Sequence, residues 1–219
     1  MKTIVTIDGP AGAGKSTIAR TLAKLLGFRF LDTGAMYRSV TFAADRDKVA
    51  AGDAAGVARL LGRLKIDFTP DGRTIVDGVD ATAAIREPRI TAMVSPFAAD
   101  PAVRAEMARL QREIGAAGRL VCEGRDMGSN VFPDAAVKFY LDASSTVRAE
   151  RRRLELLASG TEIPLEELRQ DIEARDRADS ERTAAPLVRT PDMIYVDTSR
   201  LTREEAVATL FATARQILG

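Results

Sequence analysis

A glycine-rich stretch near the start of the chain has the composition of an anion-binding site. Residues 9–16, "GPAGAGKS", fit the pattern G-x-x-x-x-G-K-[ST]. Glycines let successive backbone N–H groups curl around a phosphate, and a following helix turns its positive dipole end toward the same point. Lys15 would supply a charge for the β- and γ-phosphates, and Ser16 a hydroxyl for Mg²⁺. The stretch predicts a site for a nucleoside triphosphate; the alternative is a tightly packed turn without a ligand.

The phosphate-loop pattern is shared by GTPases, ATP-driven machines and kinases, so other residues must distinguish them. Guanine-selective proteins usually carry an Asn-Lys-x-Asp element, whereas the single asparagine here, Asn130, is followed by Val131. This excludes the GTPase interpretation. Glu123, at the end of "LVCE", could hold a metal in a motor or in a kinase, so it does not separate these two classes.

Three further clusters of polar residues could form the acceptor side of such a site. They are "LDTGAMYR" (31–38), "CEGRDMGSNVFPDA" (122–135) and "EARDRADSER" (173–182). The first two follow expected strands, where α/β sheets place their ligands. In the third, Arg175, Asp179 and Arg182 are spaced to share one face of a helix. Each cluster taken alone fits equally well an ordinary helix, a local Arg–Asp salt bridge or a solvated charged face.

The elements that must position these clusters alternate between strands and helices. Short β-branched or apolar runs predict strands at 3–8, 28–31, 119–123, 136–141 and 193–197. Helical spacing predicts helices at 16–26 (ended by Gly27), 36–47, 53–64, 101–115 (opened by Pro101 and closed by Gly118), 145–158, 165–182 (starting at Pro164), and after a Thr202–Glu205 capping box. Residues 65–85 instead predict a small antiparallel sheet joined by turns. The alternation indicates an α/β fold with a parallel sheet.

The composition excludes several classes of binding partner and of catalytic group. The chain has 219 residues, with 32 basic against 31 acidic, which argues against nucleic acid as a partner. It has no histidine, which excludes histidine bases and ligands, and one cysteine, which excludes an internal disulfide. The N-terminal apolar run is too short for a signal peptide or a membrane span. We therefore expect a cytoplasmic protein with no membrane partner. We also expect a monomer, because the core needs no partner chain.

Taken together, the clusters resemble those of bacterial cytidylate kinases, members of the nucleoside monophosphate kinase family. The resemblance is carried by "TIDGPAGAGKST", "LDTGAMYR", "EGRDMGSNVFPDA", "LDASS", "RDRADSER" and "APLV", in order, over nearly the whole chain. It implies a P-loop NTPase-like parallel five-stranded sheet flanked by helices, with an inserted small antiparallel sheet and a helical lid. It also implies a single domain 1–219 divided into a core (about 1–35, 90–143 and 185–219), an acceptor-binding insertion (about 36–89, its sheet at about 65–85) and a lid (about 144–184).

The resemblance further implies transfer of the γ-phosphate of ATP to CMP or dCMP, with Mg²⁺ as cofactor. The expected ATP-binding residues are Gly9, Pro10, Ala11, Gly12, Ala13, Gly14, Lys15, Ser16 and Thr17, with Ser16 also on the metal. The expected CMP-binding residues are Thr33, Arg38, Ser95, Arg104, Arg125, Asp126, Arg175, Asp179 and Arg182. The expected catalytic residues are Lys15, Arg125, Arg175 and Arg182. Two positions depart from the usual pattern: Thr33 stands where serine is frequent, and Ser16 where some members have glycine.

The chemistry of the residues agrees with this implication. A phosphate acceptor is already mostly dianionic, because its second pKa lies near 6, so it needs no general base. It needs two charged phosphates held in line with their charge neutralised, which suits Lys15 and several arginines. Arg148, Arg151, Arg152 and Arg153 could add to these from a mobile lid, or form salt bridges with Glu150 and Glu155. A kinase for another small acceptor, such as shikimate, and a non-catalytic nucleotide-responsive module are the competing hypotheses.

Overall fold

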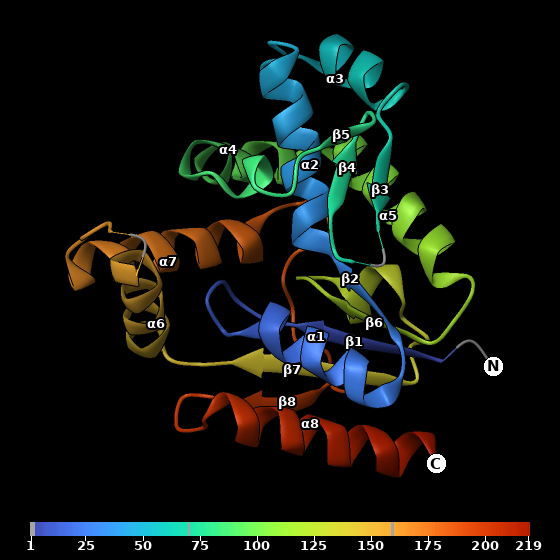
Figure 1. Cartoon of the computed structure of the whole chain (residues 1–219), viewed down its shortest axis with the longest axis vertical. Helices are drawn as coiled ribbons and strands as arrows, with labels where there is room; N and C mark the ends of the chain where they lie inside the picture. The colour runs from blue at the N-terminus through green and yellow to red at the C-terminus, as the bar shows by residue number, and fades with distance from the viewer. Residues whose placement is uncertain (1–2, 70, 159) are drawn as a thin grey trace. The chain divides into compact units, whose positions relative to one another are not determined.

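The computed structural model describes residues 3–69, 71–158 and 160–219, which fold into two compact units (Figure 1). The first unit joins residues 1–31 with residues 115–219, and the second unit contains residues 32–114. These boundaries differ from the expected division into core, insertion and lid, which stays a prediction.

A five-stranded sheet forms the centre of the first unit. Its strands are β1 (Ile4–Asp8), β2 (Arg29–Asp32), β6 (Leu120–Glu123), β7 (Val137–Asp142) and β8 (Ile194–Asp197), in the spatial order β2-β6-β1-β7-β8. Strand β1 runs parallel to β6 on one side and to β7 on the other, and β7 runs parallel to β8. All residues of β1 and β6 are buried, as is typical of parallel strands covered on both faces. The predicted parallel five-stranded sheet is confirmed.

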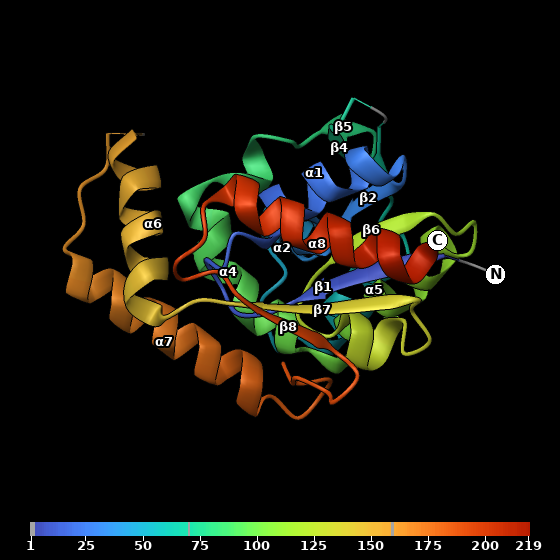
Figure 2. The same cartoon turned by 90° about the horizontal axis from the view of Figure 1, so that it is seen from below.

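Two helices, α1 (Lys15–Leu26) and α8 (Arg203–Leu218), supply much of the apolar core against this sheet. Leu22 of α1 and Leu210 of α8 are fully buried with Ile7 and Phe139 of the sheet. Figure 2 shows α8 lying along one face of the strands. Gly27 ends α1 in a left-handed conformation, and Thr202 and Glu205 form the capping box of α8. Both of these features were predicted.

Helices α6 (Ser145–Ala158) and α7 (Leu165–Glu181) pack side by side beyond the end of β7 (Figure 2). Ala149, Leu168 and Ile172 form a small core between them. The predicted ranges hold, with one correction at the end of α7. Arg182 has φ −62° and ψ 141°, so it has left the helix, and it shares no helical face with Arg175 and Asp179.

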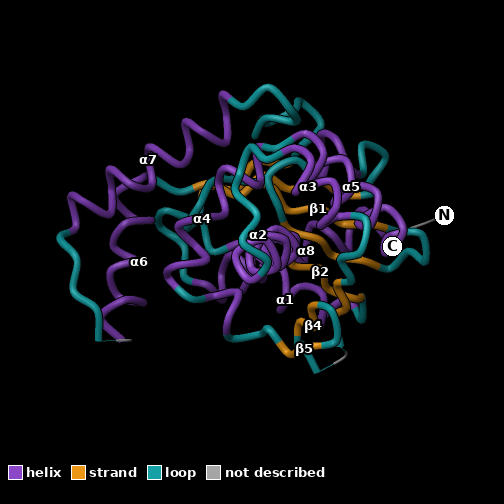
Figure 3. The backbone as a smooth tube through the Cα atoms, turned by 90° about the horizontal axis from the view of Figure 1, so that it is seen from above, coloured by secondary structure: helices purple, strands orange, loops and turns teal. Residues whose placement is uncertain are grey.

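The second unit contains most of the remaining helices and the small sheet (Figure 3). Its helices are α2 (Thr33–Arg46), α3 (Ala54–Leu61), α4 (Pro88–Ala99) and α5 (Pro101–Gly115), with a 3₁₀ turn at Ala84–Arg86. Strands β3 (Ile66–Phe68), β4 (Thr74–Val76) and β5 (Val79–Asp80) pair antiparallel. The small sheet predicted within 65–85 is confirmed.

Three local features differ from the expectations. Helix α2 begins three residues before the expected Met36, because the Asp32 carboxylate accepts a hydrogen bond from the Ala35 N–H at 2.8 Å and caps it. Helix α4 was not predicted, since Pro96 interrupts its interior. Met127–Val131, for which no regular element was predicted, forms a single π-helical turn. Helix α5 covers the predicted residues 101–115, and Gly118 beyond it has a positive φ of 67°.

Candidate active site

The phosphate loop has the strand before it and the helix after it that its motif requires. Gly9 has φ +146°, and a Cβ at this position would lie 1.9 Å from the carbonyl oxygen of Leu141. Gly12 and Gly14 also have positive φ, at +77° and +80°. Only glycine accepts this backbone path at low cost. The residue types of the loop are therefore explained by its geometry, next to β7 and at the N-terminus of α1.

Lys15 is the first residue of α1 and is buried. Its ammonium donates a hydrogen bond to the carbonyl oxygen of Pro10 at 2.6 Å. Burial, followed by the positive charge of Arg125, lowers the pKa of Lys15 to about 7, against the opposing charges of Glu123 and Asp8. An anionic ligand beside the Lys15 ammonium would stabilise its charged form and raise its pKa again, so this environment favours binding of an anion.

Ser16 and Glu123 form the pair of oxygen groups best suited to a metal ion. The Ser16 hydroxyl donates to Glu123 Oε1 at 2.6 Å, and Glu123 is buried at the end of β6. Over the described ranges 3–69, 71–158 and 160–219, no group of three or more His, Cys, Asp or Glu residues could hold a metal. Mg²⁺ usually takes one or two protein ligands beside substrate phosphates and water. The donors present fit Mg²⁺ bound in this way.

Asp8, at the end of β1, binds two backbone N–H groups. Its two carboxylate oxygens accept hydrogen bonds from the backbone N–H groups of Met127 at 2.8 Å and Gly128 at 2.7 Å. Burial raises the pKa of Asp8 to about 6 in spite of these two hydrogen bonds. Asp8 thus fastens the π-helical turn after β6 to the end of β1. Since both oxygens of Asp8 are occupied in this way, Glu123 is better suited than Asp8 to a metal ion.

A largely buried network of charges joins the loop after β6 to the end of α7: the side chains of Arg125 and Asp179 are each 18% exposed, and those of Asp126 and Arg182 less than 10%. Arg125 Nε donates to Asp179 Oδ2 at 2.8 Å, while Arg182 lies 3.6 Å from Asp179 Oδ1 and 3.4 Å from Asp126 Oδ1. Burial is the largest single influence and raises the pKa of Asp179. The charge and hydrogen bond of Arg125, together with the charges of Arg175 and Arg182, outweigh it and hold this pKa below its ordinary value. Arg125 therefore pairs with a carboxylate far along the chain.

Asp126 and Arg175 complete the expected site residues of the first unit. The side chain of Asp126 is 2% exposed and accepts a hydrogen bond from Asn130 Nδ2 at 3.0 Å. Asn130 was not among the expected site residues, although it lies four positions beyond Asp126 in the same cluster. Arg175 lies on α7, and its positive charge lowers the pKa of both Lys15 and Asp179. The structure thus brings Lys15, Arg125, Asp126, Asp179 and Arg182 together within one unit.

The other expected acceptor residues belong to the second unit. Thr33 is the buried first residue of α2, and Arg38 lies on the same helix. Ser95 is exposed on α4, and Arg104 is buried on α5. Arg104 Nη1 donates to the carbonyl oxygen of Ala98 at 3.1 Å, and its guanidinium lies 5.7 Å from the ring centre of Tyr37. Tyr37 thus holds the Arg104 guanidinium by a cation–π contact, a partner that spacing alone did not indicate.

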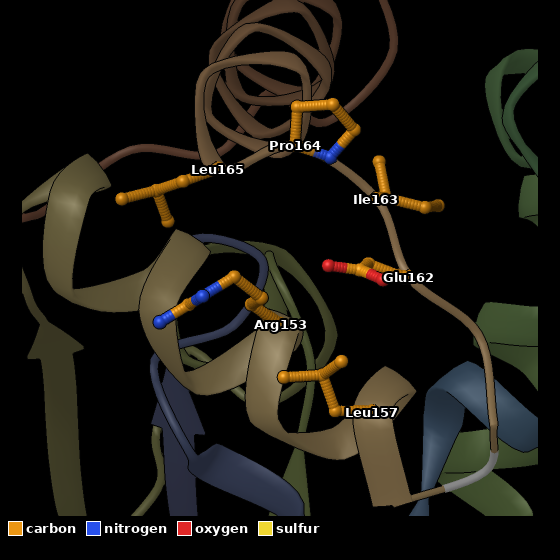
Figure 4. A pocket seen from close by; sticks show the side chains of 6 residues that line it. All are labelled: Arg153, Leu157, Glu162, Ile163, Pro164 and Leu165. Atoms are coloured by element: carbon orange, nitrogen blue, oxygen red, sulfur yellow. The ribbon is translucent and has the colours of Figure 1, made fainter.

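The four arginines near the start of α6 have separate surroundings. Arg151 donates to the carbonyl oxygen of Thr198 at 2.7 Å, and Arg152 pairs with Glu155 at 3.2 Å. Arg153 lines a surface pocket of about 430 Å³ between α6 and the segment that leads into α7 (Figure 4). Arg148 is buried against the phosphate loop. The salt-bridge alternative therefore holds for Arg152, whereas Arg148 is built into the site.

Comparison with known proteins identifies the family. The family model for cytidylate kinase matches residues 5–216. The chain is 43% identical over 218 residues to a cytidylate kinase of Geobacter sp. (strain M21), covering 98% of this chain and 94% of that protein. It is 45% identical to a bifunctional pantoate ligase/cytidylate kinase of Synechococcus sp. (strain JA-2-3B'a(2-13)), and spans only 41% of the length of that relative.

A solved structure of an uncharacterized protein from Eubacterium ventriosum ATCC 27560 shares the fold. Its TM-score is 0.57 at 10% identity, covering 97% of this chain and 98% of that chain. Within the described part of the chain, no helix is both long and apolar enough to cross a bilayer. The family match over nearly all of the sequence and the phosphate loop on a five-stranded sheet agree: the chain belongs to the cytidylate kinase family.

Proposed function

We propose that the protein transfers the γ-phosphate of ATP to CMP and dCMP, giving CDP and dCDP. The observation that carries this proposal is the similarity to the cytidylate kinase of Geobacter over 94% of its length. Arg104 and Asp126 support it as candidate base-reading residues, because a kinase for another small acceptor such as shikimate has no base to read.

The phosphate loop holds the triphosphate of ATP through residues 9–17. Backbone N–H groups and the N-terminus of α1 face its negative charge, and the Lys15 ammonium supplies the positive charge at its β- and γ-oxygens. Ser16 and Glu123 are the residues that would hold Mg²⁺, which when bound neutralises phosphate charge. The second pKa of the acceptor phosphate lies near 6, so its oxygen is ionised at neutral pH and this chain provides no base for it.

Arginines bind the acceptor phosphate and the moving charge. Arg38 and Arg125 bind the phosphate of CMP, while Arg175 and Arg182 stabilise the charge that develops during transfer. Asp179 holds Arg125 and Arg182 in place from between them. Fixed guanidinium groups need little reorganisation when the phosphoryl group moves, and this preorganisation is the main contribution of the protein to the rate.

The base is selected by a carboxylate. Asp126 accepts a hydrogen bond from the cytosine amino group, as carboxylates do for that edge, and Ser95 and Arg104 are the other residues assigned to the base. Uracil carries an oxygen where cytosine carries the amino group, so the carboxylate repels it. Thr33, Arg175 and Asp179 lie near the ribose in this assignment. Helices α6 and α7 act as a lid that keeps water from competing as acceptor.

One experiment tests the proposal directly. The protein is incubated with Mg·ATP and with CMP, dCMP, UMP, AMP, GMP or shikimate in turn, and ADP formation is measured. We expect fast turnover with CMP and dCMP only. Turnover with shikimate alone would establish the competing kinase, and binding of ATP without turnover of any acceptor would establish a non-catalytic module. We further propose a cytoplasmic monomer with no nucleic-acid or membrane partner, which light scattering and retention on DNA at moderate salt would test.

A further inference from the structure

Arg148 binds the phosphate loop from the start of α6. Its side chain is buried and donates from Nη1 to the carbonyl oxygen of Ala11 at 2.9 Å and from Nε to the carbonyl oxygen of Ala143 at 2.8 Å. A Cβ on Gly12 would lie only 3.2 Å from the Cβ of Arg148. The guanidinium thus joins the loop, the end of β7 and α6 in one place.

Asp176, on α7, binds both partners of this contact. Its Oδ2 lies 2.6 Å from Arg148 Nη1, and its Oδ1 accepts the N–H of Ala11 at 3.3 Å. The two polar groups of the Ala11 backbone are therefore bound by Asp176 and Arg148. We call this set of Ala11, Arg148 and Asp176 the loop clamp. It connects segments that lie 165 residues apart in the sequence.

The position of Asp176 on α7 gives the loop clamp a consequence for the reaction. Asp176 directly follows Arg175 and lies three residues, less than one helical turn, before Asp179. A shift or rotation of α7 against the phosphate loop would change the position of Arg175, whose charge acts on Lys15, and of Asp179 relative to that loop. We propose that Asp176 is a positioning residue, which acts through Arg148 and Ala11 to hold the ATP-binding loop and the phosphate-binding face of α7 in one frame. This inference rests on the proposed function.

Charge balance makes the roles of the two side chains separable. The Asp176 carboxylate lies against the phosphate loop, where an uncompensated negative charge would repel a triphosphate; Arg148 compensates it. Replacing Arg148 by methionine leaves that carboxylate unpaired, so ATP affinity should fall about tenfold or more. Replacing Asp176 by asparagine removes the negative charge, so ATP affinity should change less than about threefold, while kcat falls about 10- to 100-fold because α7 is no longer held.

The test compares R148M, D176N and the double variant by ATP titration calorimetry and by steady-state kinetics with CMP. We expect the double variant to regain ATP affinity relative to R148M without regaining kcat. E173Q is the matched control. Glu173 also lies on α7 and links it to α6 through Ser145 at 2.8 Å, so it tests the packing of the two helices without the loop. We expect E173Q to keep the wild-type kcat.

Several results would overturn the inference. They are an unchanged kcat in D176N, an equal loss in D176N and E173Q, or no recovery of ATP affinity in the double variant. If D176N lacks a cooperative unfolding transition, R148K replaces it. A lysine keeps the charge but cannot reach Ala11, Ala143 and Asp176 at once, so we expect wild-type ATP affinity with reduced kcat, and an unchanged kcat would overturn the inference. Wild-type protein that binds ATP but does not phosphorylate CMP would instead refute the proposed function, while the ATP-affinity arms would still test the clamp.

Discussion

Two sets of Arg–carboxylate pairs look alike in the sequence and differ in the structure. On α5, Arg109 pairs with Glu106 at 2.6 Å and with Glu113, at spacings of three and four residues. At the end of α7, Arg182 and Asp179 are also three residues apart. The side chain of Arg109 is 53% exposed, whereas that of Arg182 is 7% exposed and its partner Asp126 is 3% exposed.

The difference in exposure between the two sets of pairs distinguishes solvated charges from charges with a functional role. An exposed ion pair adds little to the free energy of folding, because each charge only exchanges contacts with water for contacts with its partner. A buried ion pair loses the hydration of both charges, and its own contacts must offset that large cost. Charges are rarely buried for stability alone, because apolar residues of similar volume would do as well or better. The buried network of Arg125, Asp126, Asp179 and Arg182 is therefore where function is expected, and the pairs on α5 are not.

The largest effect should come from the buried lysine. K15A should lower kcat by about 10³-fold, because the fixed charge at the β- and γ-oxygens is lost, while the thermal unfolding midpoint is retained or raised, since a costly buried cation is removed. K24A, an exposed lysine on the same helix, is the control and should keep wild-type activity. A folded K15A protein with near-normal turnover would show that the phosphate loop is wrongly assigned.

Removing the acid at the centre of the network should have the next largest effect. D179N leaves Arg125 and Arg182 without their shared carboxylate, so kcat should fall about 10- to 100-fold and the protein should lose about 3 kcal/mol of stability. Because Asp179 contacts both arginines, turnover should fall with CMP and with dCMP. A further loss with CMP is expected if Asp179 also binds the ribose 2′-hydroxyl as assigned, and an equal loss would leave it only the role of orienting the arginines. R175A and R182A should lower turnover with both substrates.

Base selection gives a third and smaller effect. D126A should leave ATP affinity unchanged and weaken the preference for CMP over UMP by about 1–3 kcal/mol, the value of one lost hydrogen bond and one lost repulsion. The ratio of kcat/KM for CMP to that for UMP measures this change. N130A should shift the ratio in the same direction but less, since Asn130 only holds Asp126. Unchanged discrimination in D126A would reduce Asp126 to a salt-bridge partner of Arg182.

The lowered pKa of Lys15 predicts how ATP binding depends on pH. Because the triphosphate favours the charged ammonium, binding takes up a proton above pH 7, and ATP affinity should fall by up to about tenfold per unit between pH 7 and 9. The same shift destabilises the free protein in full below pH 7, where both the folded and the unfolded chain are protonated. The destabilisation is relieved as the pH rises from about 7 toward 10.5, because the unfolded chain binds more protons in that window. Calorimetry in two buffers of different ionisation enthalpy measures the proton uptake, and K15A should abolish it.

The fold was predictable where local patterns decide it. Strands β1 and β6 are short, mostly apolar or β-branched runs, β7 is an apolar run interrupted by Lys138, and the Thr202–Glu205 box marks the start of α8. Helix α4 was missed because of Pro96 in its interior, although its buried residues Ile90, Val94 and Phe97 have helical spacing. Helical spacing and proline predict opposite structures there, and packing within the second unit decides between them.

The site was predictable in its residue types but not in its pairings. The phosphate loop, Arg125, Asp126 and the α7 cluster could all be named from motifs, and Glu123 from its place at a strand end. The partner of Arg125 could not, because Asp179 is 54 residues away and Asp126 is adjacent. Asp176 was passed over for the same reason, since its importance depends on Ala11, 165 residues earlier. Adjacency in the sequence says little about pairing when the fold brings distant segments together.

Removing an exposed ion pair should have the smallest effect on activity and stability of all these changes. R109A removes both contacts to Glu106 and Glu113, yet these side chains are solvated and exchange a partner for water. We expect kcat and the ratio of CMP to UMP use to be unchanged, and the unfolding midpoint to stay within experimental error of the wild type. Raising the salt concentration should remove even the small remaining difference, because exposed charges are screened. If R109A instead lowered kcat as much as R182A does, burial would not be what distinguishes functional arginines here, and α5 would have to contribute to the site through its charges.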